Sequence, residues 1–153
     1  MNLFSQLNNP LIAILAGTLF TAIIQSSTAS VGVLQTIYKK GLISFNMATN
    51  VIYGQNIGTC ITAFLSSING NPNAKRLSVI HVLINIIGTL VFVVASYFIP
   101  FVSFIENLTS NYSMQIAYMH TFFNLASTIL FLPFDSCLIY LAYKIIPITK
   151  GEK

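Results

Sequence analysis

Five long apolar segments with almost no charge inside them constrain the fold of this 153-residue chain more than any other feature. Only 7% of the residues are charged, whereas a soluble domain has about 25%, so the chain lacks the charge to cover a water-facing surface. A helix needs roughly 20 residues to cross the apolar core of a bilayer. We therefore predict an all-α integral membrane protein, with a single membrane domain over residues 1–153. Its apolar segments cover residues 10–38, 41–68, 77–99, 116–132 and 134–148.

The basic residues support a multi-pass protein of the cell membrane that contacts membrane lipid. Side chains at the ends of membrane segments reach toward the lipid headgroups. A nucleic-acid partner would need a basic stripe with interleaved aromatic side chains; the aromatic residues here lie inside the apolar segments, so no nucleic acid is expected. All seven bases lie between the apolar segments or near their ends: Lys39, Lys40, Lys75, Arg76, Lys144, Lys150 and Lys153.

The first two apolar segments are each longer than one span requires, and polar and small residues interrupt each near its middle. The interruptions cover residues 25–30 and 53–59. Such a segment forms either a re-entrant hairpin or one tilted, broken helix, and both forms bring interrupted backbone to membrane depth. Interrupted backbone is tolerated there only where it is buried in protein or lines a wet cavity. The pattern therefore predicts two helix breaks inside the membrane.

The two interruptions together are typical of a solute or ion transporter. Half-helix ends at mid-membrane supply carbonyl groups for a cation and N–H groups for an anion. Taken singly, serine and threonine in a membrane helix more often serve packing, but two interruptions of the same kind favour a binding site. Neutral side chains also suit a site that must release its cargo. They are Gln25, Ser26, Ser27, Thr28, Gln55, Asn56, Thr59 and Thr62.

A second pattern pairs a histidine with an asparagine four residues later, followed by a small residue and a threonine. The pairs are His81 with Asn85 and His120 with Asn124. Positions i and i+4 share one helix face, so each pair points in one direction. Hydrogen bonding between helices is the favoured interpretation, while direct contact with the substrate and a proton relay or pH sensor remain open.

An enzymatic function is not expected. The chain has no GxSxG, HExxH, Walker or glycine-rich dinucleotide motif. Ser26 and Ser27 have no neighbouring set of a histidine and an acid, which a hydrolase would need to activate a serine. A membrane-embedded hydrolase that uses His81 or His120 is a minor alternative. No organic cofactor is expected.

The two interrupted motifs resemble those of the sodium-dependent phosphate cotransporter family, which comprises the type II Na/Pi cotransporters and their bacterial relatives. The run from Gly17 to Gly32 resembles the family's QSS-type motif, and the run from Gly54 to Ala63 resembles its second signature. The resemblance covers the chain from about residue 10 to residue 148. Thr28 stands where many relatives have a third serine, and Cys60 replaces a threonine.

The resemblance implies sodium-coupled symport of inorganic phosphate, with sodium as the coupling ion. It implies a re-entrant hairpin over residues 10–38 with the QSS motif at its tip, followed by a broken helix over residues 41–68. By this resemblance, phosphate is bound by Gln25, Ser26, Ser27, Thr28 and Asn56. Sodium is bound by Ser26, Ser27, Asn56, Gly58, Thr59 and Thr62. The residues His81, Asn85, His120 and Asn124 join helices or line the site.

Only one copy of each motif is present, whereas the family has two in inverted repeats. The chain therefore resembles one half of an inverted-repeat transporter, and most closely the second, C-terminal repeat. Three explanations are open: an antiparallel homodimer, a separate chain that supplies the partner repeat, or a fragment of a longer transporter. We favour the homodimer. The alternative functions are a non-transporting membrane subunit that needs a partner, and an anion channel.

Overall fold

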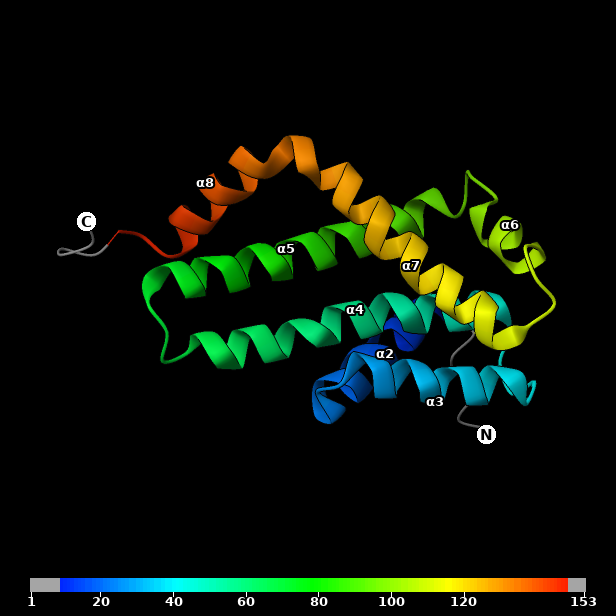
Figure 1. Cartoon of the computed structure of the whole chain (residues 1–153). Coiled ribbons are helices and arrows are strands. Elements are labelled where there is room, and N and C mark those ends of the chain that lie inside the picture. The colour runs from blue at the N-terminus through cyan, green and yellow to red at the C-terminus, as the bar shows by residue number, and fades with distance from the viewer. Residues whose placement is uncertain (1–8, 149–153) are drawn as a thin grey trace.

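The computed structural model describes residues 9–148, and the regular elements in this part of the chain are all helical (Figure 1). The predicted all-α fold is therefore confirmed. Two helical stretches, Pro72–Ala95 and Tyr112–Ile145, are long and apolar enough to cross a membrane. In chain order the elements are α2 (Pro10–Ile24), α3 (Ser27–Lys39), α4 (Phe45–Ser67), α5 (Pro72–Ala95), α6 (Phe101–Asn107), α7 (Tyr112–Phe131), the 3-10 turn η1 (Leu132–Phe134) and α8 (Asp135–Ile145).

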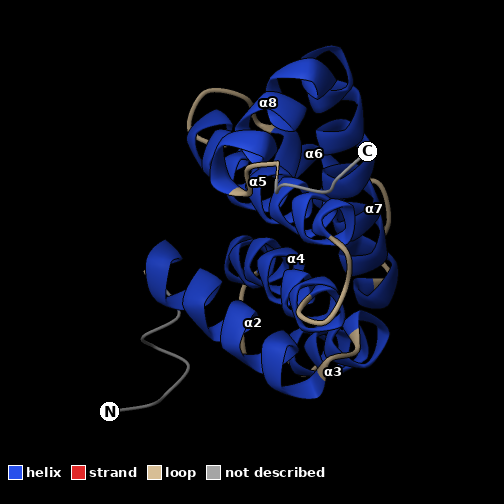
Figure 2. Cartoon of the chain, turned by 90° about the vertical axis from the view of Figure 1, so that its left-hand side faces the viewer, coloured by secondary structure: helices blue, strands red, loops and turns tan. Residues whose placement is uncertain are grey.

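Helix α4 lies at the centre of the bundle, with α2 and α3 on one side and α5 on the other (Figure 1 and Figure 2). Helix α5 runs antiparallel to α4, α7 packs against α3, α4 and α5, and α8 packs against α5. The apolar core lies between these helices. It includes Ile52 and Tyr53 from α4, Phe92 from α5 and Phe123 from α7. The rings of Tyr53, Phe92 and Phe123 contact one another, with centroids 5.1–6.4 Å apart.

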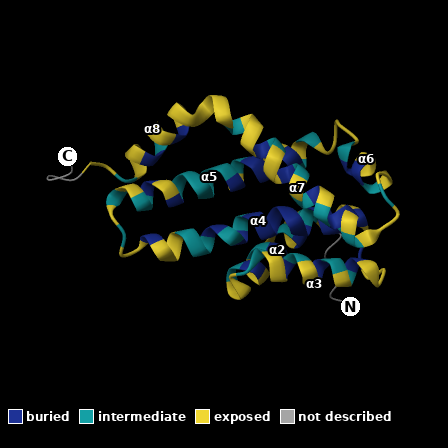
Figure 3. Cartoon of the chain, viewed as in Figure 1, coloured by how far each residue is buried: buried dark blue, intermediate teal, exposed yellow. Residues whose placement is uncertain are grey.

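The outward faces of the bundle are apolar rather than charged. Helix α8 and the second half of α7 are largely exposed (Figure 3), and Leu125, Ile129 and Leu132 are among the exposed side chains. On α2, Leu19 is 62% exposed and Ile23 is 80% exposed. An apolar surface of this extent is typical of a protein that lipid or a partner covers.

Helices α2 and α4 are in backbone contact because glycine stands where they meet. A Cβ atom added to Gly54 would run into the main-chain oxygen of Ile14, and one added to Gly58 would lie 2.5 Å from the main-chain oxygen of Thr18. Gly17 faces α4 in the same way. Small residues four positions apart let membrane helices approach closely, and here they bring the two interrupted segments together.

The predicted break in the segment 41–68 is wrong, because α4 is one continuous helix from Phe45 to Ser67. Several of its polar side chains, including Asn56 and Thr59, donate hydrogen bonds to carbonyl groups of the helix itself. Asn56 Nδ2 donates to the Ile52 carbonyl over 2.9 Å, and Thr59 Oγ1 donates to the Asn56 carbonyl over 2.6 Å. The run of small and polar residues at 53–59 therefore serves close packing and local hydrogen bonding without unwinding the backbone.

The predicted break in the segment 10–38 is present. Helix α2 ends at Ile24, α3 begins at Ser27, and the chain turns back between them (Figure 1). Gln25 has a φ of 56°, in the left-handed region, and Ser26 is extended. These two residues make the reversal.

Two helix starts differ from the predicted segments because capping residues set them. Helix α5 starts at Pro72 instead of residue 77, since Asn71 Oδ1 accepts the N–H of Ala74 over 2.8 Å. Helix α7 starts at Tyr112 instead of residue 116, since the Asn111 side chain caps it. The joint between the predicted segments 77–99 and 116–132 also contains a helix, α6, with Val102 and Ile105 buried.

Candidate functional site

The turn between α2 and α3 brings four of the predicted site residues together; we call Gln25, Ser26, Ser27 and Thr28 the tip. Gln25 and Thr28 are exposed, and Ser26 and Ser27 are half-buried. Left-handed backbone at a residue other than glycine costs roughly 1–2 kcal/mol. The hydrogen bond from the Gln25 N–H to the Thr21 carbonyl, 2.8 Å long, closes α2 in this conformation. The tip is therefore a defined turn with neutral polar side chains on its surface.

The first turn of α3 begins at the tip, and Thr28 and Ala29 in this turn are exposed. Ser26 caps the helix, and its Oγ accepts the N–H of Ala29 over 3.3 Å. The first N–H groups of a helix have no partner inside it, and the helix dipole adds partial positive charge there. Together with the Ser26 and Ser27 hydroxyls, these groups can bind an oxyanion without a basic side chain.

A buried network below the tip joins three helices. Thr21 Oγ1 of α2 and Ser30 Oγ of α3 lie 2.6 Å apart, and Gln55 Nε2 of α4 donates to Ser30 Oγ over 2.8 Å and to the Ser30 carbonyl over 3.0 Å. All three residues are at most 1% exposed. Among the described residues, the Gln55 Oε1 atom has no hydrogen-bond partner. This network fixes α3 and the tip relative to α4.

Only part of this network could be predicted from the sequence. The sequence places Gln55 among the neutral donors and Ser30 inside the first interruption, but Thr21 lies outside both interruptions. The spacing of Thr21 could have indicated its place near the site, because it lies four residues before Gln25 and such positions share one helix face.

Replacing Ser30 by alanine should lower the free energy of unfolding in detergent by about 1–3 kcal/mol, because Thr21 and Gln55 would each lose a partner in a buried site. Thermal or denaturant unfolding of the purified chain measures this. Ser66 is the matched control: it is exposed on α4, its hydroxyl bonds to the Thr62 carbonyl, and Ser66→Ala should change stability by less than about 0.5 kcal/mol. Equal effects of the two substitutions would contradict the role assigned to the network.

The far end of α3 is held by α7 and the loop before it. The Tyr38 hydroxyl donates to Gln115 Oε1 over 2.7 Å, and Gln115 Nε2 donates to the carbonyl groups of Glu106 and Thr109 over 2.7 and 2.8 Å. Tyr38 and Gln115 are both buried. Helix α3 is therefore anchored at both ends, while its tip side chains stay available.

The predicted residues of the second motif lie on α4 and face different surroundings. Asn56 is 3% exposed, and Gly58 packs against α2, while Thr59 and Thr62 are half-buried. Thr62 Oγ1 donates to the Thr59 carbonyl over 2.8 Å. No hydrogen bond within residues 9–148 joins these four residues to the tip; the link between the two motifs runs through Gln55 and Ser30.

The two histidine–asparagine pairs also form bonds within their own helices. Asn85 Nδ2 donates to the His81 carbonyl over 2.9 Å, and Asn124 Nδ2 donates to the His120 carbonyl over 2.8 Å. Asn85 is buried between α4 and α5, whereas Asn124 is exposed on α7. The α5 pair is joined to α4 through Cys60, whose sulfur lies 3.7 Å from the His81 carbonyl oxygen. In the described chain, no hydrogen bond joins one pair to the other.

Comparison with known proteins identifies relatives over most of the chain. The model of a family described as Na+/Pi-cotransporter matches residues 2–126. The chain is 35% identical to "Uncharacterized protein YqeW" of Bacillus subtilis over 88% of this chain and 43% of that protein. It is 32% identical to "Putative inorganic phosphate export protein YjbB" of Salmonella typhimurium over 78% of this chain and 22% of that protein.

A shorter match extends to a mammalian protein. The chain is 36% identical to "Sodium-dependent phosphate transport protein 2A" of Rattus norvegicus over 37% of this chain and 9% of that protein. This chain thus spans less than half the length of each of these curated relatives. No solved structure matches it.

Proposed function

Because the chain belongs to the Na+/Pi-cotransporter family, which is a family of transporters and not of enzymes, we propose that it is one repeat of a sodium-coupled transporter of inorganic phosphate. The observation that carries this proposal is the tip. The sequence motif of the family coincides there with a helix break and an open helix N-terminus. The names of two relatives, which refer to phosphate export and to sodium-dependent phosphate transport, support the same substrate.

Phosphate binds at the tip in this proposal, held by the first N–H groups of α3 and by Gln25, Ser26, Ser27 and Thr28. These groups are neutral, so they can hold the anion and also release it. Asn56 is the remaining proposed phosphate ligand. Its amide nitrogen already donates to the Ile52 carbonyl, so it would contact phosphate only through a rearrangement of that side chain.

Sodium takes oxygen ligands from Ser26, Ser27, Asn56, Gly58, Thr59 and Thr62 in this proposal. Because α4 is continuous, few of its oxygen atoms are free to bind sodium. Backbone carbonyls inside an unbroken helix already accept hydrogen bonds. The Thr59 and Thr62 hydroxyl oxygens are therefore the main sodium ligands that α4 can supply. Both residues are half-buried, so they remain reachable by a small cation.

We place the α2–α3 pair in the membrane as a re-entrant hairpin of a multi-pass protein in the cell membrane. Helix α2 has 15 residues, which is about 22 Å at 1.5 Å per residue. The apolar core of a bilayer is about 30 Å thick, so α2 alone does not cross it. Leu19 and Ile23 are exposed near the end of α2, which suits a helix that enters lipid and turns back at Gln25.

We further propose that a second copy of the chain, inserted in the opposite orientation, completes the site. The supporting observation is a polar stripe on α7, formed by Thr121, Asn124 and Thr128, which are all exposed. Polar side chains on a membrane helix are expected to face protein or a wet cavity. The stripe follows the i, i+3, i+7 spacing of one helix face, so one partner helix can cover it. A separate chain that carries the partner repeat would cover the same stripe.

Uptake of phosphate into proteoliposomes that contain only this purified chain tests the function. We expect uptake that depends on an inward sodium gradient. Uptake that does not depend on the sodium gradient would favour an anion channel. No uptake by folded protein would contradict the homodimer, and would favour a non-transporting subunit or a chain that needs a separate partner repeat.

Replacing Asn124 by leucine should weaken self-association about tenfold, because the stripe would lose interhelical hydrogen bonds in both copies, each worth about 0.6–1.7 kcal/mol. The fraction of dimer in detergent as a function of protein concentration measures this. Leu125→Ala, one residue further along the same helix, is the control and should leave the dimer fraction unchanged. A dimer that is insensitive to Asn124→Leu would exclude this face as the interface.

A further inference from the structure

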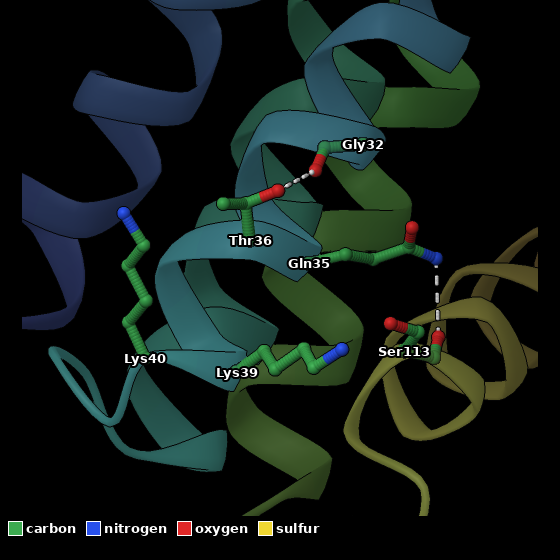
Figure 4. Close-up of a pocket in the computed structure, with 6 residues that line it drawn as sticks. All are labelled: Gly32, Gln35, Thr36, Lys39, Lys40 and Ser113. Carbon is green, nitrogen blue, oxygen red and sulfur yellow. Dashed lines mark hydrogen bonds between the residues drawn. The ribbon is translucent and has the colours of Figure 1, made fainter.

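A groove at the C-terminal end of α3 lies apart from the tip (Figure 4). It has a volume of about 520 Å³ and lies between α3 and the start of α7. The Gln35 side chain closes one wall by donating to the Ser113 carbonyl over 3.1 Å. Lys39 extends along the Ser113 side, and Lys40 extends from the opposite side of the helix (Figure 4). The lining residues are Gly32, Gln35, Thr36, Lys39, Lys40 and Ser113.

The charge in this groove is uncompensated. Lys39 and Lys40 are exposed, and within residues 9–148 neither ammonium group has a hydrogen-bond or ion-pair partner. Neither of the acids in that part of the chain, Glu106 and Asp135, lines the groove. The Lys39 ammonium group beside the polar wall can bind an anion with several acceptor oxygens, such as a phosphate group, and Lys40 on the other side of the helix adds positive charge nearby.

The other end of the groove is open and lies deeper along the hairpin. A Cβ atom added to Gly32 would meet nothing within 4 Å. Gly32 precedes Lys39 by seven residues, which is about 10 Å along a helix. The neighbouring Val33 is 41% exposed. The groove therefore passes from the lysines to open helix surface at Gly32, and the exposed Val33 lies next to that end, outside the groove lining. This distance is roughly the length of a lipid glycerol unit and the first carbons of its chain.

We propose that this groove binds an anionic phospholipid, with its phosphate held by Lys39 and further attracted by Lys40, and with its glycerol and first acyl carbons lying along Gly32 toward the neighbouring Val33. Inorganic phosphate offers the lysines the same oxygens, but it has nothing to occupy the space at Gly32. The lipid matches both ends of the groove, since lysine at a membrane surface meets anionic headgroups. This site is separate from the transport site; it rests on the proposed placement of the α2–α3 pair in the membrane, and its test does not depend on transport.

Native mass spectrometry of the full chain in neutral detergent tests the proposal with three probes: phosphatidylglycerol, phosphatidylcholine with the same acyl chains, and inorganic phosphate. Lys39→Gln with Lys40→Gln removes the charge from the groove. Lys75→Gln with Lys144→Gln removes the same charge elsewhere and is the matched control. Gly32→Leu keeps both lysines and fills the open end. The thermal midpoint of each variant without lipid verifies that it is folded.

We expect one saturable phosphatidylglycerol per chain, with affinity reduced at least about tenfold in both the Lys39/Lys40 and the Gly32 variants and unchanged in the Lys75/Lys144 control. Equal loss in the two lysine pairs would show diffuse attraction and overturn the site. Full binding to Gly32→Leu, or displacement of the lipid by inorganic phosphate, would overturn the lipid assignment. Equal binding of phosphatidylcholine, or no bound lipid in the unaltered chain, would do the same.

Discussion

Replacing Ser26 and Ser27 together by alanine should lower sodium-dependent phosphate uptake about a hundredfold. Both hydroxyls lie at the open N-terminus of α3, where the proposed site holds phosphate. A hydrogen bond to a charged group contributes about 1.5 kcal/mol or more, so two of them contribute about 3 kcal/mol. Each 1.4 kcal/mol corresponds to tenfold in an equilibrium constant. Uptake of labelled phosphate by proteoliposomes measures the loss.

The loss of the helix cap at Ser26 must be separated from the loss of a ligand. Ser44 provides the matched control, because it caps α4 with a hydrogen bond of the same length: its Oγ accepts the N–H of Met47 over 3.3 Å, the distance found at Ser26. Removing either cap should reduce stability by about 1 kcal/mol, but Ser44→Ala should keep uptake. Ser27→Ala leaves the cap intact and should still reduce uptake. Normal uptake by the double variant would exclude the tip as the phosphate site.

The break at Gln25 and Ser26 could be predicted from the sequence, because its causes are local. A run of six polar or small residues interrupts an apolar segment, and Ser26 can cap the helix that follows. The run at 53–59 looks similar in the sequence, but the helix continues through it without a break. Its two glycines meet the backbone of α2, and contact with a distant helix cannot be inferred from spacing within one segment.

The buried network also depends on contacts between helices that spacing within one segment does not reveal. The sequence predicts Gln55 as a member of a polar site, but its bonds to Ser30 depend on how α3 packs against α4. Helix α6 was missed because a seven-residue helix is too short to give a periodic pattern. Local signals therefore located the tip, and only the packing of the helices showed what holds it in place.

These contacts divide the α2–α3 pair into fixed and available parts. Helix α2 is fixed by its glycine contacts with α4, and α3 is fixed by Ser30 near the tip and by Tyr38 at the far end. The Gln25 and Thr28 side chains, in contrast, are exposed. The backbone of the site is already fixed, while its ligand side chains are exposed. A small anion can therefore bind without the entropic cost of ordering the backbone.

Replacing Gly54 by alanine should therefore lower the free energy of unfolding by at least about 2 kcal/mol, because the added methyl group would overlap the main chain of α2 and force the helices apart. The atom it would meet is the carbonyl oxygen of Ile14, which belongs to the backbone and cannot rotate away. Thermal and denaturant unfolding in detergent measure the change. Uptake should also fall, because displacement of α2 moves the tip.

The same substitution at Gly32 should raise the free energy of unfolding instead of lowering it. Gly32 lies inside α3 with open space at its Cβ position, and alanine is favoured over glycine in a helix by about 0.8–1.0 kcal/mol. Gly32→Ala should therefore stabilise the chain, while Gly54→Ala destabilises it. If both substitutions stabilised the chain, the two helices would not be in backbone contact at Gly54. Close packing against α2 would then not explain the glycines of the second motif.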